Sequence, residues 1–133
     1  MIYNRDSVWY HLYTAYARQV VEGKWADLSV DEAFSRNTDG EECPISRAYR
    51  PGDWTSICED AGFEVDYVGG YLSLNELTML GRHWAAAIAD DRLDDEHRRF
   101  LRSLTFDAKG YPMYEGLHAG IGGTYWLRKP AAT

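Results

Sequence analysis

The chain is poor in basic residues, has two cysteines and contains no long apolar run. Its 133 residues include 14 Lys and Arg against 21 Asp and Glu, which gives a formal net charge of −7. A phosphate-binding surface needs a basic stripe, and none is visible, so we expect no nucleic-acid partner. No segment approaches a membrane span, and the N-terminal MIYNRDS lacks a basic region followed by an apolar run. We therefore expect no membrane partner and no signal peptide.

The sequence also lacks the spacing of a metal or thiol site. Cys43 and Cys58 are the only cysteines, and the simplest compartment is the cytoplasm with both thiols reduced, although a disulfide stays open. Cys43 has no obvious base beside it, which favours an inert small residue over a nucleophile. The acid-rich segment 90–97 does not match an EF-hand loop, and no H-E-x-x-H is present, so a solvated turn and helix start explain it better. We expect no metal.

What is present predicts one packed domain over residues 1–133. Apolar residues make up 45% of the chain, with five Trp and ten Tyr, which argues against disorder. Ser7 is a candidate N-cap for a helix to about Glu22, on which Trp9, Leu12, Tyr13, Tyr16 and Val20 share a face. Two capping boxes, 29–32 and 73–76, predict two more helix starts.

The segment 49–68 predicts a helix that leads into a strand. Pro51 suits a first helical turn, and Gly62 suits the left-handed position that closes a helix. Residues 63–68 then alternate as in a half-buried strand, and Gly69 with Gly70 predicts a bend or bulge. A final aromatic strand ends before Pro130.

This helix-to-strand unit resembles the late α/β segment of class I S-adenosylmethionine-dependent methyltransferases, where a helix ending in AGF leads into the sixth strand. MIYN (1–4) resembles the end of the fifth strand, and GIGGTYWLRK (120–129) resembles the seventh. The polar block TDGEECPISRAY, with the upstream NRDSVWYHLYTAY, is similar to a subgroup of bacterial type 11 enzymes that carry a helical insert after the fifth strand. The resemblance implies an α/β fold: a partial Rossmann-like sheet of about three strands, ordered five, seven, six, with several helices.

The chain departs from that family where the cofactor binds. It has no strand followed by a glycine-rich turn that opens a helix, and Gly120, Gly122 and Gly123 precede a strand instead. The resemblance therefore covers only the C-terminal part of such an enzyme, and S-adenosylmethionine is implied by the resemblance alone. We expect no binding of it by this chain, and no activity without the missing half. Whether Met1 is a true start or lies inside a longer frame stays open.

The inner edge of the fifth strand would face the missing half. We expect either a partner chain or a rearranged homodimer to cover that edge, unless the helix at 8–22 covers it.

The resemblance places the surface for a small-molecule methyl acceptor after the fifth strand. His11 is the candidate base there, with a packed helix histidine as the alternative. The neighbouring aromatic and polar candidates for substrate binding are Tyr3, Asn4, Trp9 and Tyr13.

A second set of substrate-binding candidates, Asp39, Arg47 and Tyr49, lies in the polar block 39–49. Arg47 either clamps a carboxylate or phosphate of the acceptor or pairs with Asp39 or Glu42. Tyr49 closes this set. His118 lies before the last strand, where it either reaches a cleft or is an ordinary loop residue.

Three functions follow, and the sequence leaves all three open. The first is the acceptor-binding C-terminal segment of a methyltransferase. The second is a stand-alone, non-catalytic interaction or dimerisation module with the same fold. The third is a small-molecule enzyme that uses His11 or His118 as its base.

Overall fold

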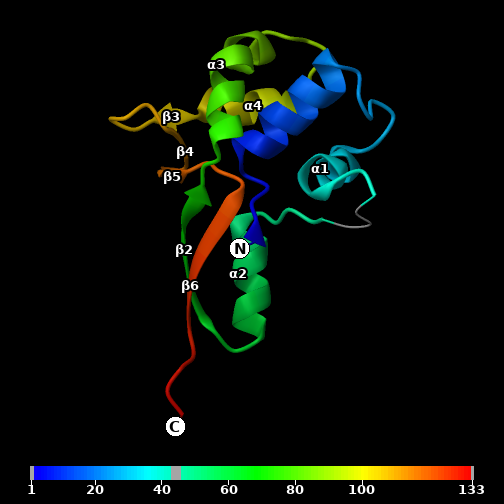
Figure 1. Cartoon of the computed structure of the whole chain (residues 1–133). Helices are drawn as coiled ribbons and strands as arrows, with labels where there is room; N and C mark the ends of the chain where they lie inside the picture. The colour runs from blue at the N-terminus through cyan, green and yellow to red at the C-terminus, as the bar shows by residue number, and fades with distance from the viewer. Residues whose placement is uncertain (1, 43–45, 133) are drawn as a thin grey trace.

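Two regions make up the molecule, a helical layer and a slender sheet with one helix alongside it (Figure 1). The computed structural model describes residues 2–42 and 46–132. The sheet region consists of β1 (Ile2–Tyr3), α2 (Pro51–Asp60), β2 (Glu64–Tyr71) and β6 (Gly122–Arg128). The helical layer consists of η1 (Trp9–Val21), α1 (Val30–Asp39), α3 (Leu74–Ile88) and α4 (Asp95–Ser103), with the short strands β3 (Thr105–Phe106), β4 (Pro112–Tyr114) and β5 (Leu117–His118).

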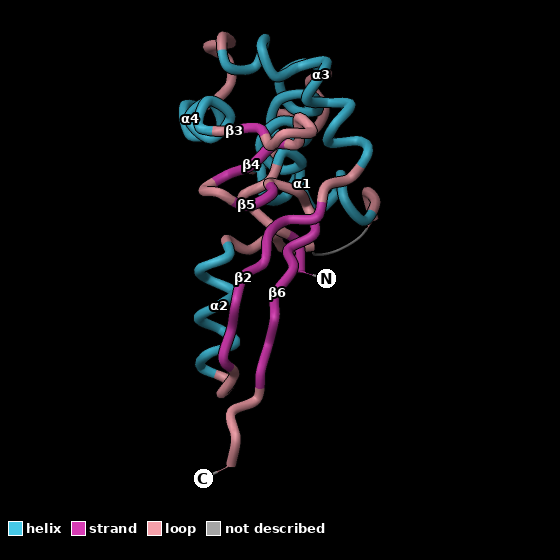
Figure 2. Tube along the Cα trace, turned by 90° about the vertical axis from the view of Figure 1, so that its left-hand side faces the viewer, coloured by secondary structure: helices cyan, strands magenta, loops and turns pink. Residues whose placement is uncertain are grey.

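The first sheet has the order β1-β6-β2, and β6 is antiparallel to both neighbours. β1 and β2 are therefore parallel to each other, and the chain between them forms η1, α1 and finally α2, which leads into β2 (Figure 2). The α/β class is confirmed, whereas a Rossmann-like arrangement is not, and the second sheet, β3-β4-β5, was not predicted from the sequence.

Local sequence signals explain the path from α2 into β2. Pro51 occupies the first turn of α2, and Gly62 takes a φ of 94°, a conformation that residues with a Cβ rarely adopt. The predicted irregularity lies between Tyr67 and Gly69, where the pairing register of β2 with β6 shifts. Beyond it, a Cβ on Gly70 would lie 2.3 Å from the carbonyl oxygen of Gly120, so only glycine allows this close approach.

The free edge of β1 is partly covered by the chain itself. Asn4 forms a parallel bridge with Tyr49, whose N–H donates to the Tyr3 carbonyl at 2.9 Å. The Arg5 N–H in turn donates to the Tyr49 carbonyl at 2.9 Å. The covering segment is thus residue 49, not the helix at 8–22.

The helical layer holds the main core, and η1 differs from the expected α-helix in its winding. η1 is a π-helix, and after it the Glu22 N–H still donates to the Ala17 carbonyl, five residues back. The wider turn changes which side chains face inward. The buried ones are Tyr10, His11, Leu12 and Thr14–Ala17, so the face predicted from 3.6-residue spacing was only partly right.

The helix starts follow the predicted capping signals. Ser73 and Glu76 form the reciprocal capping box of α3, and the Ser29 hydroxyl accepts from the Glu32 N–H at the start of α1. Gly81 does not interrupt α3. No helix of the described residues is long and apolar enough to cross a membrane.

Candidate functional site

An open cleft of about 880 Å³ lies where the chain leaves β1 and where α2 begins. Its wall combines both signs of charge with hydroxyl and aromatic groups. The charged residues are Asp6, Arg50, Asp53, Glu96, Arg99 and Glu115, and His11, Phe100, Ser103, Thr105 and Tyr114 also line it. Four carboxylates face two arginines, so the cleft is acidic on balance.

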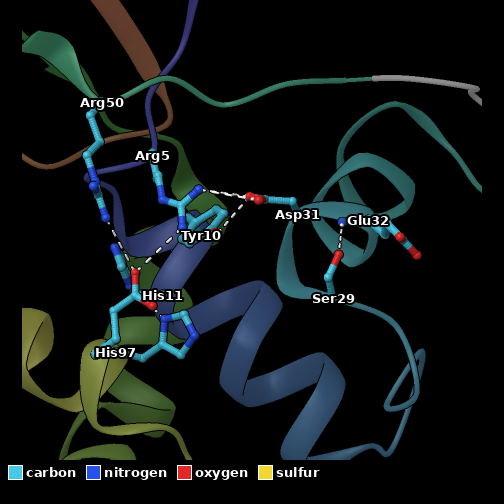
Figure 3. Close-up of polar contacts among 9 residues, drawn as sticks. Arg5, Tyr10, His11, Ser29, Asp31, Glu32, Arg50 and His97 are labelled. Atoms are coloured by element: carbon cyan, nitrogen blue, oxygen red, sulfur yellow. Dashed lines mark hydrogen bonds and ion pairs between the residues drawn. The ribbon is translucent and has the colours of Figure 1, made fainter. Parts of the chain in front are cut away.

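His11 lies in the wall of this cleft and pairs with a second histidine (Figure 3). Its Nδ1 atom lies 2.8 Å from Nδ1 of His97 on α4, and its ring stacks on Phe100 at 4.0 Å between centroids. Each histidine is only 4% exposed. One Nδ1 must donate and the other must accept, so the pair keeps this bond only while at least one ring is neutral.

Burial sets the charge state of both rings. Loss of hydration lowers the pKa of His11 well below its usual value, and the neighbouring His97 lowers it further. The pKa of His97 is also lowered, again mainly by burial. Both rings are therefore neutral at neutral pH, which is the state a general base needs.

The geometry also bears on the proposed role of His11 as a base. One ring nitrogen contacts His97, and a hydrogen bond with the Arg5 backbone favours the charged form of the ring. A ligand that donates a proton to His11 has to reach a ring that is almost fully buried. The role of His11 in catalysis stays a prediction.

A charged network above the histidine pair joins three helices (Figure 3). Arg5 forms ion pairs with Asp31 at 3.1 Å and Glu96 at 3.6 Å, and its guanidinium lies 4.7 Å from the Tyr10 ring centroid. The Tyr10 hydroxyl donates to Asp31 at 2.8 Å. Burial, followed by this carboxylate, raises the pKa of Tyr10. Of these residues, Glu96 lines the cleft, so the network holds one carboxylate of its wall.

Two of the predicted substrate-binding residues are held by internal contacts. The Tyr3 hydroxyl donates to Asp39 at 2.7 Å, and Asp39 also accepts from the Ser46 hydroxyl. Asn4 is 1% exposed, and its side-chain amide donates to the carbonyl oxygens of Asp6 and Gly120. These contacts join β1 to the polar block and to the start of β6.

The aromatic candidates on η1 lie on its side toward α1. The Trp9 indole N–H donates to the Thr38 hydroxyl at 3.1 Å, and its ring meets Tyr13 at 4.7 Å. Arg18 donates to the Tyr13 hydroxyl at 2.6 Å. Neither aromatic residue lines the 880 Å³ cleft.

The remaining candidates are spread around the molecule. Arg47 is exposed and, among the described residues, forms no ion pair with Asp39 or Glu42. Tyr49 packs its ring against Trp54 at 5.1 Å. Cys43 lies outside the described residues.

His118 lies beside the cleft, in a smaller hollow. Its Nε2 contacts a carboxylate oxygen of Asp107 at 2.9 Å. It lines a hollow of about 130 Å³ that shares Asp6, Tyr114 and Glu115 with the cleft. Of the candidates predicted from the sequence, His11 and His118 are thus the two that the structure brings to adjoining hollows.

Three residues of this region were not predicted as site residues from the sequence. His97 was assigned only to a helix, because its pairing with His11 joins positions 86 residues apart. Asp6 is half-buried between the two hollows, and burial raises the pKa of its carboxyl group.

Glu76 is the third, and it is a fully buried carboxylate. Its oxygens accept from the backbone N–H groups of Trp9, Ser73 and Ile121 at 3.0 to 3.1 Å. Burial raises its pKa to about 6 against the opposing effect of these donors. The capping-box motif predicted its position, but the motif carries no signal for the contacts with η1 and β6.

The glycines near β6 do not form a cofactor cradle. A Cβ on Gly120 would lie 2.0 Å from the Tyr71 carbonyl oxygen, and one on Gly123 would lie 2.8 Å from the Ile2 carbonyl oxygen. The space beside these glycines is filled by neighbouring strands, so these residues do not fit S-adenosylmethionine. Among the described residues, no group of three or more His, Cys, Asp or Glu could hold a metal ion.

Comparisons with known proteins add no relative. No family model, no curated protein and no solved structure matches this chain.

Proposed function

We propose that the chain is the acceptor-binding C-terminal segment of an S-adenosylmethionine-dependent methyltransferase, and that a separate half supplies the cofactor site. The observation that carries this proposal is the strand arrangement β1-β6-β2. An antiparallel strand lies between two parallel strands, and α2 is the helix that leads into the second of the parallel pair. The family resemblance implies this order for its last three strands.

The position of the cleft supports the acceptor-binding part of the proposal. Asp6 follows the carboxyl end of β1, and Arg50 and Asp53 lie at the start of α2. Ligands of α/β proteins bind outside the carboxyl ends of strands, next to helix N-termini. The chain's contribution to such a reaction is to bind and orient the acceptor and to exclude water from it.

The edge of β1 favours a second candidate, the non-catalytic module. Tyr49 occupies the edge at which another half would add its strand, with two backbone hydrogen bonds of 2.9 Å. A methyltransferase half that adds its strand at this edge has to displace the segment around Tyr49. A non-catalytic module does not pair there, so it keeps this segment in place.

Titrations followed by NMR separate the two candidates. We expect S-adenosylhomocysteine to leave the spectrum of the isolated chain unchanged. We expect at least one of three probe sets, small phenols, alcohols or amines, to shift the amide signals of Asp53, Arg99 and Glu115. Arg99→Gln should weaken those shifts, and Arg82→Gln, an exposed position away from the cleft, should not.

Two results would contradict the proposal. Stoichiometric binding of S-adenosylhomocysteine contradicts the statement that the chain lacks a cofactor site. If none of the three probe sets shifts these amide signals, the result contradicts the acceptor-binding role and favours the interaction module.

A further inference from the structure

One edge of β6 is open over most of its length. β6 runs from Gly122 to Arg128 and pairs with β2 along that whole range. On its other side, β1 pairs only with Gly122 and Gly123. Among the described residues, no strand lies beside the remaining part of that edge, which is long enough to accept a further strand.

The hydrogen bonds of the sheet show which backbone groups this edge presents. The Asn4 N–H donates to the Ile121 carbonyl at 2.8 Å, so the carbonyl group of Ile121 points to the β1 side just before β6 begins. In an antiparallel ladder, successive residues direct their N–H and C=O groups to opposite sides. Odd-numbered residues of β6 therefore face the β1 side, so Tyr125 and Leu127 each present an N–H and a C=O at the open edge.

The side chains beside this edge are exposed and apolar. Trp126 is 64% exposed and Leu127 is 44% exposed, and both belong to β6 itself. α2 packs on the other face of the sheet, next to β2 (Figure 1). An unpaired edge next to exposed aromatic and aliphatic side chains favours strand addition.

We propose that a second copy of this chain binds here, with the two β6 strands antiparallel about a two-fold axis at Trp126. In this register, Tyr125 pairs with Leu127 of the partner subunit, and Leu127 pairs with Tyr125 of the partner subunit. Both residues then exchange N–H and C=O bonds, so all four open groups of each copy are satisfied. The two sheets become one. This proposal does not rest on the proposed methyltransferase function.

Charge and packing agree with a self-complementary contact. The two Trp126 side chains meet at a non-hydrogen-bonded position, where cross-strand side chains are closest and aromatic pairs stabilise a sheet. Arg128 lies diagonal to Trp126 of the partner subunit, and its charge is balanced within its own chain by Glu64 at 3.5 Å and Asp66 at 3.4 Å. No like charges face each other, as an isologous interface requires.

Disulfide trapping tests the register. Residues at a non-hydrogen-bonded pair have Cα atoms about 4.5 Å apart, within the range that a disulfide spans. We expect Trp126→Cys to form a covalent dimer under mild oxidation. Val68→Cys is the matched control on the same face, because β2 and its copy would lie three strand spacings, about 14 Å, apart. The unmodified chain gives the background from Cys43 and Cys58.

Sedimentation equilibrium tests the contact itself. We expect the wild-type chain to dimerise, and Trp126→Lys, which places two cations across the axis, to raise the dimer Kd about 100-fold. Val68→Lys should leave Kd within about twofold. Circular dichroism checks that both variants fold. A wild-type monomer at NMR concentrations would overturn the proposal, as would a dimer that Trp126→Lys does not weaken or equal trapping at residues 126 and 68.

Discussion

The helical layer and the sheet region differ in how they are stabilised. In the helical layer, one buried cluster joins η1, α3 and α4, with Leu12, Leu93 and Leu101 at most 2% exposed. In the sheet region, Ile57, Phe63, Val68, Trp126 and Leu127 are all at least 39% exposed. The helical layer thus has an apolar core of its own, although it also exposes Leu74 (79%) and Phe106 (44%), whereas the sheet region contributes little to that core. The comparison teaches that backbone pairing holds the sheet region more than a core of its own does, which is the reason that we propose a partner for it.

The largest effect should come from truncating the helical core. Leu101→Ala in α4 removes a fully buried side chain, so it should lower the free energy of unfolding by about 3 kcal/mol. Ile57→Ala in α2, a truncation of similar size at a position 47% exposed, should cost less than about 1 kcal/mol. Urea unfolding of both variants measures the difference. Equal losses would show that the two regions do not differ as described.

The next largest effect concerns Glu76, which joins the two regions through Trp9 and Ile121. Glu76→Gln should cost about 1–3 kcal/mol, because the amide nitrogen then faces a backbone N–H that has no acceptor.

The pH dependence of that loss follows from the raised pKa of Glu76. Its pKa rises from 4.5 to about 6 on folding, so its contribution to stability is present below pH 4.5 and is lost as the pH rises through 6. The cost of Glu76→Gln should therefore be larger at pH 4.5 than at pH 7, by about 2 kcal/mol. Chemical unfolding at both pH values provides the measurement, and a loss that grows with pH would contradict the account.

A smaller effect should come from the buried histidine pair, His11 and His97. Both members of the pair have lowered pKa values, so their contribution is present above pH 6.5 and is lost as the pH falls below it. His97→Gln keeps a polar partner for His11 but removes one of the two rings. We expect it to flatten the acid side of the stability profile. Thermal unfolding of the wild-type chain and the variant between pH 4 and pH 7 provides the measurement, and two profiles of the same shape would contradict the account.

The sequence carried more information about the sheet region than about the site. Pro51, Gly62 and the alternation in residues 63–68 act locally, so α2 and β2 were predictable from these residues. The order of the strands was expected only from the family resemblance. The π winding of η1 was not predictable, because its pattern of Trp, Leu and Tyr also fits 3.6-residue spacing. Nor was the short sheet β3-β4-β5, whose strands span two or three residues each.

The site was predicted in part for the same reason. His11 was singled out by its place after a strand end, and the cleft lies there. Its partner His97 and the buried contacts of Glu76 depend on packing between distant segments, which no local pattern encodes. Asn4, Trp9 and Tyr13 were chosen as surface groups but form internal hydrogen bonds.

Amide hydrogen exchange tests most directly the claim that the sheet region is completed by a second copy. The Trp126 N–H points toward β2, so we predict that it is protected at every protein concentration. The N–H groups of Tyr125 and Leu127 point to the open edge, so they should exchange fast in dilute solution and slow down as the concentration rises. Fast exchange of both at all concentrations would contradict the account, and so would protection that does not depend on concentration.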